Sequence, residues 1–409
     1  MKPIKPEGQT LDNQQLIGLK EEFQEELDHI LDWWQNRMID WENGGFYGRM
    51  DGQSQLHAEA DKSVILNSRI LWTFAAAARL SDNYGYKNTA DRAYQYLKQH
   101  FVDPLEGGVF WMLDYKGEPV QTKKQIYAQA FTIYALSEYY MLTQSQEALN
   151  TVFEIFWLIE KYSYDRKTDG YYEAFNREWQ TMHDLRLSEK DANAAKTMNT
   201  HLHVLEAYTN LYRACPHEAV SLALTKLIVC FLEKFIDPEH HHLNLFFDQE
   251  WNLSASHISY GHDIECSWLL WEAAEVLGDE SLKKRVAPVV VQMAEATLQE
   301  GLAPNGGLNH EIEYNGHRNT DKHWWPQAEA VVGFHNAWLL SGKDHYLQAA
   351  QQSWSFIKKH LKDPKGGEWF WLVDQHEKPN LMEDKAGPWK APYHNGRMCM
   401  EMRRRLSLY

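Results

Sequence analysis

The chain has 409 residues, of which 44% are hydrophobic, and its formal net charge is -16. This length and apolar content allow a large buried core. The acidic balance argues against nucleic acids and anionic membrane surfaces as partners, because both select for clustered Lys and Arg. The basic cluster Arg403, Arg404 and Arg405 is short, and we expect it to be a solvent-exposed helix end.

The N-terminal stretch MKPIKPEGQTLDNQQ has no apolar segment of the kind that a secretory signal contains, and residues 1–15 are expected to be flexible. Nowhere does an apolar run reach the roughly 18 residues needed to span a bilayer. Cys215, Cys230, Cys266 and Cys399 form neither a C-x-x-C pair nor a disulfide framework. A soluble protein of the reducing cytoplasm is therefore expected.

An internal repeat sets the expected architecture. Six segments join a turn rich in Asp, Pro and Gly to a short aromatic run: WENGGFYGR (41–49), DPLEGGVFWM (103–112), DRKTDGYYEAF (165–175), DPEHHHLNLFFD (237–248), APNGGLNHEI (303–312) and DPKGGEWFWL (363–372). One marker residue can be aligned in each: Gly45, Gly108, Gly170, His242, Gly307 and Gly367. The spacing indicates six units of roughly 65 residues.

Two kinds of helix are predicted in each unit. Before the turn, apolar residues recur at helical spacing, as in Phe23, Leu27, Ile30, Leu31 and Trp34, which predicts a half-exposed helix. After it, residues 65–80, 127–142, 203–214, 266–278 and 328–340 are apolar or small nearly all round, which predicts buried helices.

The alternation of half-exposed and buried helices predicts an all-α (α/α)6 barrel. Six inner helices would lie within a ring of six outer helices, with short β-hairpin-like turns between the repeats, as a single catalytic domain over residues 1–409. An open helical solenoid is the alternative. Six units favour closure, because an open solenoid can stop at any number of repeats.

Unusual polar and aromatic residues collect at the N-terminal ends of the buried helices, so they should converge on one mouth of the barrel. In chain order they are Arg69, Tyr127, Gln129, Asn199, His201, His203, Glu206, His262, Glu265, Trp325, Glu329, His394 and Arg397. Helix N-termini carry partial positive charge, so such a mouth favours negative charge that develops on a ligand.

Spacing selects among the candidate residues of this mouth. Asn199, His203 and Glu206 share one helix face, which assigns His203 to the cavity and leaves His201 either there or in a structural hydrogen bond. His262 and Glu265 are three residues apart, so the carboxylate is expected to orient the imidazole.

Three further expectations concern neighbouring residues. His394 stands beside an Asn-Gly pair, as at the lip of a helix. Of the adjacent Trp324 and Trp325, the first is expected to pack between the rings and the second to face the cavity. His240, His241 and His242 are expected in an exposed loop.

A zinc site made of His203, His262 and His394 is conceivable. No H-E-x-x-H pair or acidic cluster accompanies these residues, so neither a metal nor a cofactor is expected. Phosphate-loop, dinucleotide and nucleophile-elbow motifs were not found either.

Imidazoles suit proton transfer near neutral pH, and two of them facing each other can invert a carbon beside a carbonyl. With Arg69 for the developing charge and Tyr127, Trp325 and Trp389 as flat surfaces, the residues predict a proton-transfer enzyme acting on a sugar.

Five motifs resemble those of the N-acylglucosamine 2-epimerase superfamily, and they occur in the same order. They are ILNSRILWTFAAA (65–77), MNTHLHVLEAY (198–208), YGHDIECSWLL (260–270), DKHWWPQAEA (321–330) and WKAPYHNGRMC (389–399), within a similarity that runs from about Leu16 to the C-terminus. Within the superfamily they are most similar to members that act on disaccharides. Known members have the (α/α)6 barrel.

The resemblance implies reversible C2 epimerisation of the reducing-end glucose of β-1,4-linked disaccharides such as cellobiose and lactose, through ring opening and a cis-enediolate. It implies that His262 and His394 are the acid/base pair, that Arg69 and His203 hold the reacting oxygens, and that Glu265 steadies His262. It implies that the site is lined by Tyr127, Asn199, Trp325, Glu329 and Trp389, and that Asp191 reaches the second sugar.

Other functions remain open from the sequence alone. Members of the superfamily that act on N-acylglucosamine tend to carry His in place of Gln327, so Gln327 is expected to help to select the substrate. Other members interconvert aldoses and ketoses. An inverting glycoside hydrolase using Glu265 and Glu329 is a rival, because (α/α)6 barrels often host that reaction. A sugar-binding or protein-binding module is a non-enzymatic alternative. The sequence does not indicate an oligomeric state.

Overall fold

The computed structural model describes residues 13–81, 83–188, 191–255 and 257–407. Most of the N-terminal segment that we expected to be flexible lies outside these residues, and helix α1 begins at Asn13. The outer helices are α1 (Asn13–Arg37), α3 (Tyr84–Tyr96), α5 (Gln146–Leu158), α7 (Glu218–Cys230), α9 (Glu280–Ala296) and α11 (Asp344–Phe356). The inner helices are α2 (Val64–Leu80), α4 (Ile126–Thr143), α6 (Met198–Ala214), α8 (Tyr260–Leu277), α10 (Trp324–Ser341) and α12 (Tyr393–Leu406).

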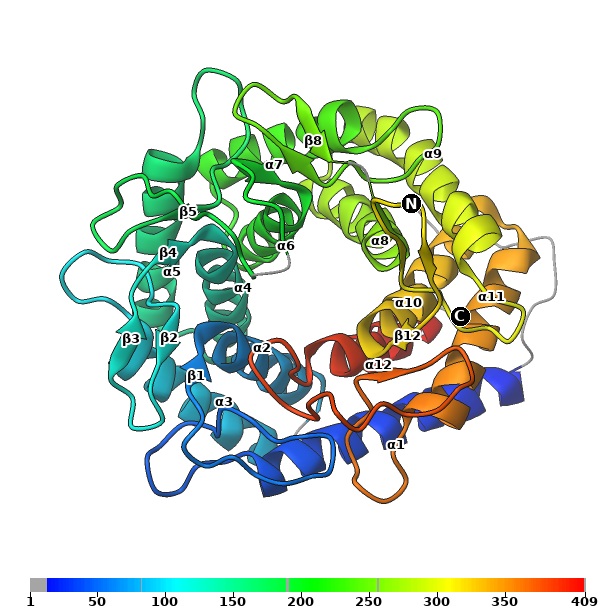
Figure 1. Cartoon of the computed structure of the whole chain (residues 1–409), viewed down its shortest axis with the longest axis horizontal. Helices are drawn as coiled ribbons and strands as arrows, with labels where there is room; N and C mark the ends of the chain where they lie inside the picture. Colours follow the sequence, from blue (N-terminus) through cyan, green and yellow to red (C-terminus); the bar gives the residue numbers. More distant parts are fainter. Residues whose placement is uncertain (1–12, 82, 189–190, 256, 408–409) are drawn as a thin grey trace.

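The six inner helices form a closed ring inside the outer ones (Figure 1). Each inner helix contacts the next in chain order, and α12 returns to contact α2. Each outer helix packs on an inner neighbour, with α1 on α12 and α11 on α10. The predicted (α/α)6 barrel is therefore confirmed, and the open solenoid is wrong.

The two kinds of helix differ in burial as their sequences predict. Residues 126–139 of α4 are all buried, because this helix is enclosed on every side. In α5 the buried residues are Ala148, Leu149, Val152, Ile155 and Phe156, which form one face. Five outer helices continue into a π-helical turn that sequence periodicity did not predict: η1 (Leu97–Phe101), η2 (Ile159–Ser163), η3 (Phe231–Phe235), η4 (Thr297–Gly301) and η5 (Ile357–Leu361).

Each outer helix leads into the predicted tight turn. In the second repeat the N–H of Asp103 donates to the carbonyl of Gly108 at 2.9 Å, and the same bond recurs between Asp165 and Gly170 at 2.8 Å. Gly108 has a φ of 68°. A Cβ there would lie 2.7 Å from the Oε1 of Gln129, so close approach as well as backbone conformation requires glycine.

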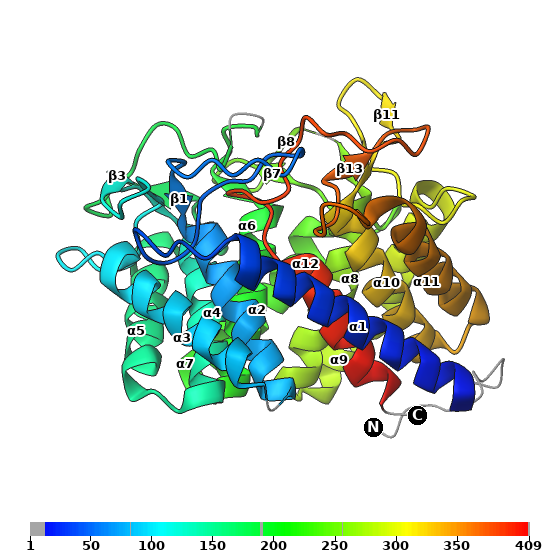
Figure 2. The same cartoon turned by 90° about the horizontal axis from the view of Figure 1, so that it is seen from below.

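Short antiparallel strands link each repeat to the next and gather at one end of the barrel (Figure 2). The sheets are β1 (Lys62–Ser63) with β2 (Met112–Leu113) and β3 (Pro119–Gln121); β4 (Lys124–Gln125) with β5 (Ala174–Phe175); β6 (Lys196–Thr197) with β7 (Phe246–Phe247) and β8 (Leu253–Ala255); β9 (Ile258–Ser259) with β10 (Glu311–Ile312) and β11 (Arg318–Asn319); and β12 (Lys322–His323) with β13 (Leu372–Val373). In each sheet, the strand that precedes an inner helix pairs with the aromatic run of the following repeat.

A buried lysine holds the turn to the inner helix in several repeats. The Nζ of Lys62 lies 2.7 Å from Asp40, and that of Lys124 lies 2.9 Å from Asp103. The fourth repeat has Ile258 at the lysine position and uses a different pair, in which the Nδ1 of His242 lies 2.7 Å from Asp263. The exposed loop that we expected at His242 is therefore wrong, because this side chain is buried against α8.

Two other points concern the surface. Arg405, expected to be exposed, is buried and donates to the Oδ1 of Asn336 at 2.9 Å, because it lies on the face of α12 that meets α10. Within the described residues, the helices are either too short or too polar to cross a membrane.

Candidate active site

Most of the residues singled out from the sequence line one cavity of about 260 Å³ at the N-terminal ends of the inner helices. They are Arg69, Tyr127, Asn199, His203, His262, Glu265, Trp325, Trp389 and His394. A neighbouring cavity of about 290 Å³ shares Asn199, His262 and Trp325 with it and is also lined by Asp191. Glu329 lies behind His394 and is not part of the cavity wall.

Helical spacing explains why these side chains converge. Tyr127, Asn199, Trp325 and His394 are each the second residue of their inner helix. Arg69, His203, Glu265 and Glu329 are each the sixth. Positions four apart share a helix face, and the closed ring turns that face of every inner helix toward the barrel axis.

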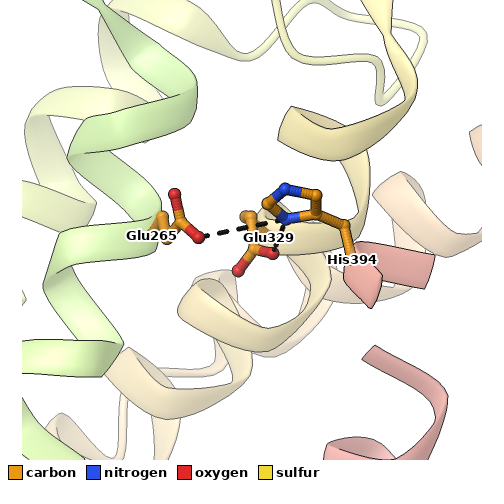
Figure 3. Close-up of side chains that lie close together, drawn as sticks. All are labelled: Glu265, Glu329 and His394. Atoms are coloured by element: carbon orange, nitrogen blue, oxygen red, sulfur yellow. Dashed lines mark hydrogen bonds and ion pairs between the residues drawn. The ribbon is translucent and has the colours of Figure 1, made fainter. Parts of the chain in front are cut away.

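His394 is held by Glu329. Its Nδ1 lies 2.7 Å from the Oε1 of Glu329 (Figure 3), and the same oxygen accepts from Arg397 at 2.7 Å. The other oxygen of Glu329 accepts from the indole N–H of Trp268 at 2.9 Å. An ionised carboxylate can only accept, so the Nδ1 of His394 carries the hydrogen and its Nε2 is free to take a proton. Burial lowers the pKa of His394 to about 3, so the imidazole is neutral.

His203 has the same arrangement with Glu206. The Nδ1 of His203 lies 2.9 Å from the Oε2 of Glu206, so the Nε2 of this ring is also unprotonated. Burial opposes ionisation of Glu206, but Arg397 and His203 outweigh it and lower the pKa of this carboxyl to about 2. His203 is neutral as well, because burial lowers its pKa.

His262 is held differently from the way we predicted. Its Nδ1 lies 2.7 Å from the Oγ of Ser259, and its ring centroid lies 4.8 Å from that of Trp325. The expected partner, Glu265, instead accepts from Arg397 at 2.8 Å and lies 3.9 Å from the Nδ1 of His394. Glu265 is turned toward the barrel axis, where the guanidinium draws its carboxylate away from His262. Burial, reinforced by the charge of Glu329, raises the pKa of Glu265 to about 8.

Arg397 connects the three glutamates. Its guanidinium contacts Glu206 and the hydroxyl of Tyr393, in addition to Glu265 and Glu329. The ligand atoms of Glu265, Glu329 and His394 lie within 4.8 Å of one another, as a metal site would require, but Arg397 already supplies a cation to both carboxylates. Arg397 also lines a third cavity, of about 220 Å³, that lies toward the C-terminal ends of the inner helices.

Arg69 and Tyr127 are oriented by each other. The guanidinium of Arg69 donates to the hydroxyl of Tyr127 at 2.9 Å and to the carbonyl of Trp389 at 2.8 Å. It lies 4.5 Å from the ring centroid of Phe131, a cation–π contact. Burial raises the pKa of Tyr127 to about 12, so the phenol keeps its hydrogen.

Three residues near the site have structural roles. His201 accepts from the backbone N–H of Tyr171 at 2.8 Å, which settles its two alternatives in favour of a structural hydrogen bond. Gln327, expected to help to select the substrate, accepts from the N–H of Leu308 at 2.6 Å and is fully buried. That expectation is wrong, because Gln327 is the fourth residue of α10 and faces the turn, as Gln129 does in α4.

The two adjacent tryptophans lie nearly as predicted, with Trp324 packed between the rings of helices and Trp325 facing the cavity. Trp324 is buried and packs on Trp371, with ring centroids 4.5 Å apart, although one part of it reaches the cavity wall. Trp325 lies between the two imidazoles, 4.8 Å from His262 and 5.6 Å from His394 by ring centroids.

Comparison with known proteins agrees with this geometry. Residues 45–396 match the family model of N-acylglucosamine 2-epimerase. The chain is 52% identical over 386 residues to a cellobiose 2-epimerase of Bacteroides fragilis, covering 94% of this chain and 98% of that one. Its identity to a cellobiose 2-epimerase of Ruminococcus albus is 42%, over 93% of this chain and 96% of that one. The structure of cellobiose 2-epimerase from Bacillus thermoamylovorans superposes with a TM-score of 0.92 at 40% identity, over 95% of this chain and 100% of that chain.

The barrel, its histidine-lined cavity and these similarities together define an isomerase of the epimerase class. The chain belongs to the N-acylglucosamine 2-epimerase family.

Proposed function

We propose that this protein reversibly epimerises C2 of the reducing-end glucose of β-1,4-linked disaccharides, with cellobiose and lactose as substrates and the mannose epimers as products. The observation that carries the proposal is the convergence of His203, His262 and His394 on one cavity beside Arg69. Imidazoles suit removal and return of a proton at a carbon beside a carbonyl. We propose that the protein works in the cytoplasm without a metal or cofactor.

In the proposed reaction, His262 and His394 act on opposite faces of C2. Once the sugar ring has opened, one imidazole takes the C2 proton and leaves a cis-enediolate. The enediolate turns about its C2–C3 bond, and the other imidazole, once it has taken a proton from solvent, gives that proton to C2. The first imidazole then releases the proton that it took to solvent. Arg69 donates to the oxygens on which negative charge develops, and the N-termini of the inner helices favour that charge. His203 holds a reacting hydroxyl by accepting its hydrogen at Nε2.

The disaccharide is inferred from the cavities and the relatives. The adjoining cavity, with Asp191 in its wall, offers room for a second sugar beside the reacting one. Asp191 is positioned by the N–H and hydroxyl of Ser188, at 2.8 and 2.9 Å from its Oδ2. Identity to the Bacteroides fragilis cellobiose 2-epimerase is 52%, against 23% to the human N-acylglucosamine 2-epimerase. Trp325 and Trp389 provide apolar faces for pyranose rings.

The geometry disfavours the rival inverting hydrolase. Its two carboxyl groups should stand about 6.5 to 9.5 Å apart on opposite sides of the glycosidic bond. Glu265 and Glu329 instead accept from the same nitrogen of Arg397, at 2.8 and 2.7 Å. Two oxygens that share one donor nitrogen lie too close together to stand on opposite sides of a glycosidic bond.

Incubation with cellobiose in D2O, followed by proton NMR, tests the proposal. We expect the C2 proton of the reducing-end glucose to be exchanged and the mannose epimer to accumulate, with the glycosidic bond intact. Release of glucose without deuterium at C2 would indicate a hydrolase. Binding of cellobiose with no exchange would indicate a sugar-binding module, and a ketose product would indicate an aldose–ketose isomerase.

A further inference from the structure

A hydroxyl residue precedes three of the inner helices, but it does not do the same thing in each. Ser63 accepts from the N–H of Leu66 at 3.0 Å, and Thr197 accepts from the N–H of Thr200 at 3.3 Å. Both are ordinary N-caps. Ser259 holds the same position before α8 but makes no capping bond, and its Oγ lies 2.7 Å from the Nδ1 of His262.

Because Ser259 bonds to His262 instead of capping α8, His262 differs from the other two imidazoles of the cavity. His203 and His394 each face an ionised carboxylate, which can only accept and therefore keeps the hydrogen on Nδ1. In the described parts of the chain, His262 forms no ion pair, and Ser259 is its hydrogen-bond partner. The hydroxyl of Ser259 has no other partner among these residues, so it can turn to accept or to donate.

Ser259 is itself held firmly. It is buried, and strand β9 places it opposite Glu311 of β10. Its fixed backbone determines where the Nδ1 of His262 can find a partner, and hence how the Nε2 of that ring points into the cavity.

We propose that Ser259 is a positioning residue that keeps His262 hydrogen-bonded in both neutral tautomers. When Nδ1 carries the hydrogen, Ser259 accepts and the Nε2 of His262 is bare, ready to take a proton. When Nε2 carries the hydrogen, Ser259 donates to Nδ1 and His262 presents an N–H to a substrate oxygen. His394 is confined to the first form by Glu329, so the two imidazoles assigned to catalysis are not equivalent.

The charges around His262 are consistent with a neutral ring. The groups that face it are the imidazoles of His203 on α6, His257 before β9, His310 before β10 and His394 on α12. Burial comes first and these rings second in holding the pKa of His262 well below its usual range. A carboxylate in place of Ser259 would raise that pKa and would fix the hydrogen on Nδ1.

Nitrogen NMR of the protein labelled in histidine tests the hydrogen bond without any substrate. We expect the two ring nitrogens of His262 to resonate between the values of the pure tautomers, while those of His203 and His394 show the Nδ1–H form. Ser259→Asp should move His262 to the pure Nδ1–H form. A wild-type His262 in the same pure form as His394, or a ring unaffected by Ser259→Asp, would overturn the proposal.

Kinetics provide a second test, and this test alone rests on the proposed epimerase function. Ser259→Ala should lower kcat for cellobiose by about 10- to 100-fold, the effect of losing one buried hydrogen bond, with little change in KM. Ser259→Thr should restore most of the rate. Ser259→Asp should shift the pH profile of kcat/KM to the alkaline side, because raising the pKa of one member of a coupled pair raises the apparent values of the pair.

Ser63→Ala is the matched control. It removes a hydroxyl at the same repeat position and should lower the melting temperature slightly, with kcat and the pH profile unchanged. An unchanged kcat in Ser259→Ala, or a loss that Ser259→Thr does not restore, would contradict the role given to the hydroxyl. If the wild-type protein exchanges no deuterium at C2 of cellobiose, the proposed function fails, while the NMR result still decides the role of Ser259.

Discussion

At the scale of single residues, the partner of each Nδ1 atom differentiates three otherwise similar imidazoles. His203 and His394 have glutamate partners and His262 has a serine, although all three rings are buried near one another. A carboxylate stabilises the imidazolium that forms when a ring takes a proton. His394 with Glu329 is therefore the stronger base of the proposed pair.

Replacing Glu329 with glutamine tests this assignment. Glu329→Gln keeps the shape of the side chain but removes the charge that stabilises the protonated form of His394. We expect kcat to fall by roughly 10²- to 10⁴-fold, the usual contribution of a positioned acid or base. Glu295→Gln, on the outer helix α9, is the control and should keep full activity. A Glu329→Gln enzyme with near-normal kcat would remove this carboxylate from the mechanism.

The residues of the site were more predictable than their partners. Convergence of Arg69, His203 and His394 follows from helix spacing and ring closure, both visible in the sequence. The bond between His262 and Ser259 was missed, because i,i+3 spacing from Glu265 looks equally favourable until the position of Arg397 is known. The contact between Arg397 and Glu265 joins residues 132 apart in the chain, so it has no local signature.

At the scale of helices and turns, buried lysines couple the hairpins to the inner ring. The Nζ of Lys62 lies 2.7 Å from Asp40 and 2.9 Å from the carbonyl of Gly44, and neither charged side chain is exposed. Asp40 also accepts from two backbone N–H groups of the turn. The pair therefore orders the turn that precedes α2.

Removal of one partner of the Lys62–Asp40 pair should lower the free energy of unfolding substantially. Lys62→Met leaves Asp40 buried without its cation, which typically costs about 3 to 5 kcal/mol of unfolding free energy. Lys87→Met is the control, because the pair of Lys87 with Asp91 is half exposed and such pairs contribute roughly 0.3 to 0.5 kcal/mol. Denaturant unfolding of both variants measures the difference. Equal losses would show that the buried pair does not hold the turn.

The repeat was predictable at this scale because glycine marks the turns. Gly45, Gly108, Gly170 and Gly367 have φ values of 60°, 68°, 84° and 97°, a region that other residues rarely adopt. The π-helical turns and the buried lysines escaped prediction. A π-turn has no strong residue preference, and lysines in a polar-looking segment such as ADKSV resemble surface residues until the fold encloses them.

At the scale of the whole molecule, Arg397 joins helices that are distant in sequence. Carried by α12, it contacts Glu206 on α6, Glu265 on α8 and Glu329 on α10. Because α12 also contacts α2, the helix that closes the ring carries the cation that neutralises the centre of the site. One guanidinium thus acts on both His203 and His394, through the glutamates that face them.

Arg397→Lys and Arg397→Met separate the charge of this residue from its shape. Lysine keeps the charge but cannot reach three carboxylates with a planar fork, so we expect a large loss of kcat with a modest loss of stability. Methionine leaves the glutamates uncompensated, and we expect it to lower the unfolding free energy by about 3 to 5 kcal/mol. Arg404→Met on the same helix removes an exposed pair with Glu401 and should cost about 1 kcal/mol or less. If Arg397→Met unfolds like Arg404→Met, the glutamates do not need this cation, and closure of the ring must rest on apolar packing alone.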